Sequence, residues 1–170
     1  EDDDPQLIFE SLNSTGLDLS EADKIRNYLL MSLAPAEQDD LYTRYWNPIE
    51  EFTKYDPSSF VRDYLTMKQG KIGRIDKIYF IFKEYAEDIN VDRATLLEDM
   101  HHYAKIYSQV DSATIGTDKL NRKLNQLRTL DSTIAYPFFM AFFEYAIKVG
   151  LAENEIYRVL DVLEAYRARR

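Results

Sequence analysis

Residues 75–89 read IDKIYFIFKEYAEDI, a stretch whose apolar side chains recur at intervals of three and four. An α-helix makes about 3.6 residues per turn, so this spacing places the apolar side chains on one face of a helix. Those side chains are Ile75, Ile78, Tyr79, Phe82 and Tyr85. A second stripe of the same kind covers residues 96–107, whereas the strict alternation typical of strands is nearly absent from the chain. The sequence therefore predicts an all-α protein.

Several helix ends can also be located from the sequence. Ser20, with Asp23 three residues later, matches a capping box, in which the two side chains satisfy each other's backbone N–H groups at a helix start. Asp56-Pro57 combines a preferred capping residue with a proline at the first helical position, so it predicts another helix start. Gly70 predicts the end of that helix, because glycine readily adopts the left-handed conformation that commonly ends helices.

Two further segments complete the predicted architecture. Pro48 is expected to bend or restart the helix that contains it, because proline lacks a backbone N–H. Residues 134–149 are apolar on nearly all sides and are predicted to form the most buried helix, ending at Gly150. We expect about seven or eight helices in a single bundle and one domain over residues 1–170.

Composition limits the classes of protein to which this chain can belong. The chain has 170 residues, of which 45% are hydrophobic and 30% charged, as is usual for a folded domain. Cysteine is absent, which excludes disulfides and fits a cytoplasmic protein. The most apolar run, residues 134–143, is too short for a membrane span. The formal net charge of −9 argues against a surface that binds nucleic acid over its whole area.

The sequence contains few candidates for catalysis or metal binding. His101 and His102 are adjacent, so on a helix they point about 100° apart and cannot both bind one metal ion, which favours a packing or surface role. No phosphate-binding glycine loop, Gly-x-Ser-x-Gly or His-Glu-x-x-His motif occurs. A self-contained hydrolase is therefore not expected.

One basic cluster is a candidate for binding nucleic acid. It consists of Lys119, Arg122, Lys123 and Arg128. These side chains could neutralise the phosphates of DNA, in which case affinity would fall steeply with salt. The alternative is a helix face that carries its charges in solvent.

The densest polar cluster lies near the beginning of the chain. Glu10, Asn13, Arg26 and Asn27 flank a predicted turn at Gly16. The helix that follows this turn starts at Ser20, and free N–H groups at a helix start favour an anion such as a phosphate. The capping and turn-forming preferences of these residue types are an alternative explanation that requires no ligand.

Residues 8–31 carry a resemblance to a known family. They read IFESLNSTGLDLSEADKIRNYLLM. This stretch resembles the signature Phe-Glu-x-x-Asn-x-x-Gly-x-x-Leu-[Ser/Thr]-x-x-Asp-x-[Ile/Val]-[Arg/Lys]-Asn of the GmrSD-type restriction and phage-defence proteins. In that family the signature lies between an N-terminal catalytic module with a ParB/sulfiredoxin-like fold and a helical region, which an HNH nuclease domain often follows.

The resemblance implies that this chain is part of a larger protein, with residues 1–31 as the signature segment and residues 32–170 as a helical bundle. It implies a site for nucleotide at the edge shared with the catalytic module. The residues implied in that site are Glu10, Asn13, Gly16, Asp23, Arg26 and Asn27. Nucleoside triphosphate and a divalent metal would be cofactors of the larger protein, with none expected in this chain alone.

Two functions from different classes follow from these observations. The first is a helical coupling or recognition domain of a nucleotide-dependent DNA restriction protein, not catalytic by itself. Its partners would be the N-terminal catalytic module, an HNH nuclease domain and DNA. The alternative is a protein-interaction bundle that contacts neither nucleotide nor DNA, and a large exposed apolar patch would favour it.

Overall fold

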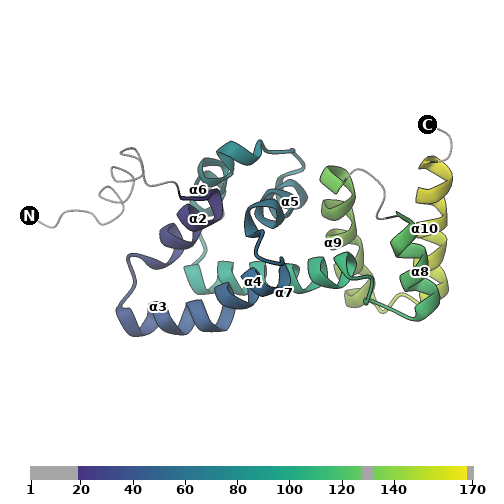
Figure 1. Cartoon of the computed structure of the whole chain (residues 1–170), viewed down its shortest axis with the longest axis horizontal. Coiled ribbons are helices and arrows are strands. Elements are labelled where there is room, and N and C mark those ends of the chain that lie inside the picture. The colour runs from purple at the N-terminus through teal and green to yellow at the C-terminus, as the bar shows by residue number, and fades with distance from the viewer. Residues whose placement is uncertain (1–18, 128–131, 168–170) are drawn as a thin grey trace, which may run out of the picture. The chain divides into compact units, whose positions relative to one another are not determined.

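The computed structural model describes residues 19–127 and 132–167, and the predictions for Glu10, Asn13, Gly16 and Arg128 lie outside these ranges. The all-α prediction is confirmed, since helices dominate the described ranges and no strand occurs in them (Figure 1). The number of helices also agrees, with eight in these ranges when residues 35–52 are taken as one continuous helix. None of the helices in the described part of the chain is both long and apolar enough to cross a bilayer.

The chain divides into two compact units, Glu1–His102 and Tyr103–Arg170. The helix α7, Arg93–Asp111, contains the boundary between them. Each unit is a set of helices with its own buried side chains, and each is described by itself below. That residues 1–170 form one domain remains a prediction.

The first unit contains α2 to α6 and the beginning of α7. The helices are α2 (Glu21–Leu30), α3 (Pro35–Leu41), α4 (Asn47–Phe52), α5 (Pro57–Gln69) and α6 (Ile78–Ile89), and a short 3₁₀ helix (Ile75–Lys77) precedes α6. The largest fully buried side chains include Trp46, Phe60, Tyr64 and Phe82. These aromatic residues fill the core of the unit, as the predicted helix stripes require.

The predicted helix ends are confirmed in this unit. The Ser20 side chain accepts from the N–H of Asp23 at 3.1 Å, and Asp23 Oδ2 accepts from the N–H of Ser20 at 3.2 Å. The Asp56 side chain accepts from the N–H of Ser59 at the start of α5, and Gly70 ends that helix with a φ of 70°. Both helices thus begin, and α5 also ends, where the local sequence places a residue suited to the terminus.

The restart predicted at Pro48 is confirmed, since the α-helix α4 begins at Asn47 and has Pro48 in its first turn. The helix continues through a π-helical segment, Tyr42–Trp46, which joins α3 to α4. In this segment the N–H of Asn47 donates to the carbonyl of Tyr42, five residues earlier. Because Pro48 has no N–H, one α-helical hydrogen bond is lost here, and the wider turn absorbs the change.

The second unit contains the end of α7 and the helices α8 (Asp118–Leu127), α9 (Ser132–Val149) and α10 (Glu153–Arg167). Its fully buried side chains include Val110, Leu124, Met140 and Leu160. Gly150 follows α9 with a φ of 67°, which confirms the predicted helix end.

The prediction that residues 134–149 form the most buried helix is wrong. Phe139, Met140 and Phe143 are buried, but Tyr145 and Ile147 are 57% and 60% exposed. Helix α9 therefore carries more apolar side chains than the other helices of this unit bury. The sequence showed how apolar the helix is, whereas the number of faces that receive a neighbour depends on the tertiary arrangement.

Candidate functional site

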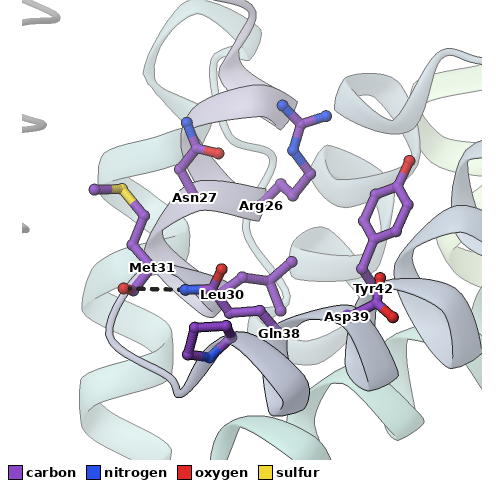
Figure 2. A pocket seen from close by; sticks show the side chains of 8 residues that line it. Arg26, Asn27, Leu30, Met31, Gln38, Asp39 and Tyr42 are labelled. Atoms are coloured by element: carbon purple, nitrogen blue, oxygen red, sulfur yellow. Dashed lines mark hydrogen bonds between the residues drawn. The ribbon is translucent and has the colours of Figure 1, made fainter.

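Helix α2 and the helix of residues 35–52 line an open pocket of about 380 Å³ within the first unit (Figure 2). Two of the predicted site residues, Arg26 and Asn27, contribute to its wall from α2. The other lining residues are Leu30, Met31, Pro35, Gln38, Asp39 and Tyr42. The pocket thus combines an apolar part from Leu30, Met31 and Pro35 with polar groups from both helices.

Arg26 is held beside the pocket by two carboxylates. Its Nη2 lies 3.1 Å from Asp23 Oδ1, and its Nη1 lies 3.4 Å from Glu50 Oε1. Glu50 Oε1 also accepts a hydrogen bond of 2.8 Å from the indole Nε1 of buried Trp46. This network fixes the guanidinium and offsets its positive charge with two acidic side chains.

Tyr42 belongs to the π-helical segment and faces the same network. Its hydroxyl donates to Glu50 Oε2 at 3.4 Å. Burial, together with the nearby negative charge of Glu50, raises the pKa of the Tyr42 hydroxyl. Tyr42 therefore remains a neutral hydrogen-bonding group at physiological pH and would not serve as a base.

The start of α2 does not offer the free N–H groups that were expected to bind an anion. The N–H of Ala22 donates to Ser58 Oγ at 3.1 Å, and that of Asp23 donates to Ser20 Oγ at 3.1 Å. Glu21 adds a further negative charge in the first turn, and its Oε2 accepts from the N–H of Tyr79 in α6. This helix start is therefore engaged in packing α2 against α5 and α6.

The structure brings the described members of the predicted nucleotide site together. Asp23 and Arg26 form an ion pair, and Arg26 and Asn27 line one pocket. Sequence reasoning missed Tyr42 and Glu50, which the helix of residues 35–52 supplies. Trp46 and Glu50 are four residues apart, a spacing that brings side chains together on a helix and could have indicated their hydrogen bond.

No family model, curated protein or solved structure matches this chain. The resemblance of residues 8–31 to the GmrSD-type signature therefore remains a hypothesis that rests on those residues alone.

The predicted nucleic-acid cluster does not form one basic surface. Lys123 is only 5% exposed, and its Nζ lies 2.5 Å from both Asp161 Oδ1 and Glu164 Oε2 in α10. Hydrogen bonds to Asp161 and Glu164 raise the pKa of Lys123 to about 12. Its charge is thus used to pack α8 against α10, and it fits neither a phosphate contact nor a solvated helix face. The prediction of DNA binding remains for Lys119 and Arg122, which are exposed.

Lys123→Met is expected to destabilise the protein by about 1–3 kcal/mol, because hydrogen bonds between α8 and two carboxylates of α10 are lost. Both carboxylates are half-exposed, so water can solvate them in the variant. The loss of stability is therefore smaller than when a fully buried charge is left without a partner. Urea denaturation measures the change. Arg122→Met is the matched control, since Arg122 is an exposed residue of the same helix, and an equal loss in both variants would contradict the assignment.

The two histidines are not part of a metal site in the described ranges. The ring of His101 lies 5.7 Å from those of Tyr45 and Phe52, as expected for a packing residue. Among the residues that the structure describes, no group of three histidine, aspartate or glutamate side chains is arranged to hold a metal ion.

Proposed function

We propose that this chain is the helical coupling or recognition domain of a nucleotide-dependent DNA restriction protein of the phage-defence type. It would contact the catalytic module through the α2 edge, defined as Asp23, Arg26 and Asn27. The observation that carries this proposal is the position of Arg26 and Asn27 in the wall of one open pocket, next to Asp23. The resemblance assigns these same residues to the boundary with the module.

The charges at the α2 edge favour contact with a protein over contact with a nucleotide phosphate. Arg26 is the basic residue of the edge, and it already has Asp23 and Glu50 as partners. A phosphate would have to displace a carboxylate or approach two of them closely, which is electrostatically unfavourable. We therefore assign phosphate binding to the catalytic module and the positioning of that module to the α2 edge.

Asn27→Ala in the full-length protein tests this proposal. Its side-chain amide is half-buried in the pocket wall and makes no hydrogen bond to another of the residues that the structure describes. We expect DNA-dependent nucleotide hydrolysis to fall by about tenfold, the equivalent of roughly 1.4 kcal/mol, with an unchanged melting temperature.

Asn47→Ala is the matched control for this experiment. Asn47 is also half-buried in the first unit, but its side chain donates to Glu51 and it does not line the pocket. Its activity should match that of the wild type. Wild-type hydrolysis in Asn27→Ala would overturn the role of the α2 edge.

The second candidate function is a protein-interaction bundle without nucleotide or DNA contact. The observation that favours it lies on α9, where Phe138, Tyr145 and Val149 are exposed. Their spacing of seven and four residues places them along one helix face. If Tyr145→Ser weakens binding to the catalytic module while Asn27→Ala does not, the α9 face is the contact and the α2 edge is not.

A further inference from the structure

We propose that the pocket beside Arg26 binds an arginine side chain of a partner protein. This inference rests on the proposed function in that the partner would be the catalytic module. The ligand chemistry itself follows from the pocket and can be tested separately. The pocket is the one shown in Figure 2, between α2 and the helix of residues 35–52.

The charge around the pocket favours a cation. Asp39 contributes an exposed carboxylate to the lining, and no cation of the described residues forms a salt bridge with it. The charge of Arg26 is already met by Asp23 and Glu50, which lie within 3.4 Å of its guanidinium. The four groups together carry two more negative than positive charges, so a cation that enters the pocket is attracted and a phosphate is repelled.

The shape and lining favour arginine among the cations. Leu30, Met31 and Pro35 supply an apolar surface, on which the methylene groups of a long side chain can pack. Asp39 and the amide oxygen of Asn27 supply acceptors from opposite walls. A guanidinium has five donors in a planar fork and is more weakly hydrated than an ammonium, so it can use both acceptors at a smaller desolvation cost than lysine.

The pocket is also structurally prepared for a ligand. Gln38 donates from Nε2 to the carbonyls of Met31 and Leu33, at 3.3 and 3.1 Å, which fixes the turn between α2 and α3. Tyr42 is held by its hydrogen bond to Glu50. Because these wall residues are already positioned, a ligand would order few additional side chains on binding.

The test is an NMR titration of this chain with N-acetyl-arginine amide. We expect concentration-dependent shifts at Arg26, Asn27, Asp39 and Tyr42, and no such shifts with N-acetyl-citrulline amide, which keeps the shape but lacks the charge. Asp39→Asn should weaken binding by about tenfold. Asp40→Asn is the matched control and should bind as the wild type does, since Asp40 is paired with Arg44 and does not line the pocket.

Three results would overturn the inference: no shifts with the arginine amide, equal binding of N-acetyl-lysine amide, or shifts of the same residues by inorganic phosphate instead. Failure here is distinguishable from failure of the proposed function. If the protein binds the arginine amide but Asn27→Ala hydrolyses nucleotide at the wild-type rate, the arginine site is supported and the proposed coupling function is contradicted. If Asn27→Ala hydrolyses nucleotide more slowly but the protein does not bind the arginine amide, the coupling function is supported and the arginine site is contradicted.

Discussion

Trp46→Ala is expected to lower the free energy of unfolding by about 3–5 kcal/mol, the largest effect of any substitution considered for this chain. Trp46 is fully buried in the first unit, and its indole Nε1 donates to Glu50 Oε1 at 2.8 Å. The substitution would remove a large apolar volume from the core and also the donor that holds Glu50 beside Arg26. Urea denaturation followed by far-ultraviolet circular dichroism measures the loss.

Two controls separate the contributions of Trp46. Trp46→Phe keeps most of the ring volume but removes the donor to Glu50, so about 1–2 kcal/mol should be lost. Phe80→Ala removes an aromatic ring that is 62% exposed in the same unit, and its effect should stay within about 0.5 kcal/mol. A loss in Phe80→Ala as large as that in Trp46→Ala would contradict the attribution of the Trp46 effect to its burial in the core.

A rise in pH from about 4 to about 7 is expected to destabilise the protein by about 2 kcal/mol through Asp63. Burial of this carboxyl raises its pKa from 3.8 to about 6, although the ion pair with Arg62 opposes the shift. A carboxyl with a raised pKa in the folded state favours folding while it is protonated. Its contribution is therefore complete below pH 3.8 and is lost as the pH rises through about 6.

Asp63→Asn tests this dependence, because the amide cannot ionise yet can still accept hydrogen bonds from Arg62. The free energy of unfolding of the variant should lack the decline that Asp63 causes over this range. Asp88→Asn removes one negative charge from an exposed position in the same unit and should keep the wild-type profile. If the decline persists in Asp63→Asn, its origin lies in another group.

The fold was largely predictable because local signals and burial agree along most of the chain. The capping box at Ser20 and the stop at Gly70 depend only on neighbouring residues, so the sequence was sufficient to place them. The exposure of Tyr145 and Ile147 was not predictable, because it depends on which faces of α9 receive a neighbour. Asp63 left a signal that could have been used, since it lies three residues after the aromatic Phe60, a spacing that places the two on the same face of a helix.

The candidate site was only half predictable. Arg26 and Asn27 belong to one helix, and their proximity to Asp23 follows from helical spacing. Asp39, Tyr42 and Glu50 reach the same place through the packing of a second helix, which no local pattern encodes. Lys123 illustrates the opposite error, because its basic character is visible in the sequence while its two acidic partners lie about forty residues away in α10.

The π-helical segment Tyr42–Trp46 has a consequence for how sequences of this kind can vary in length. A π turn holds one residue more than an α turn, so it is the natural result of a single-residue insertion. A deletion within residues 42–46 would turn the π-helical segment into α-helix, except for the hydrogen bond that Pro48 cannot donate, and α3 and α4 would keep the same faces toward the core. Such a shortened chain would retain its core and lose the turn that presents Tyr42 to the pocket. A one-residue gap at this point of an alignment would thus separate homologues that keep the pocket from those that keep only the fold.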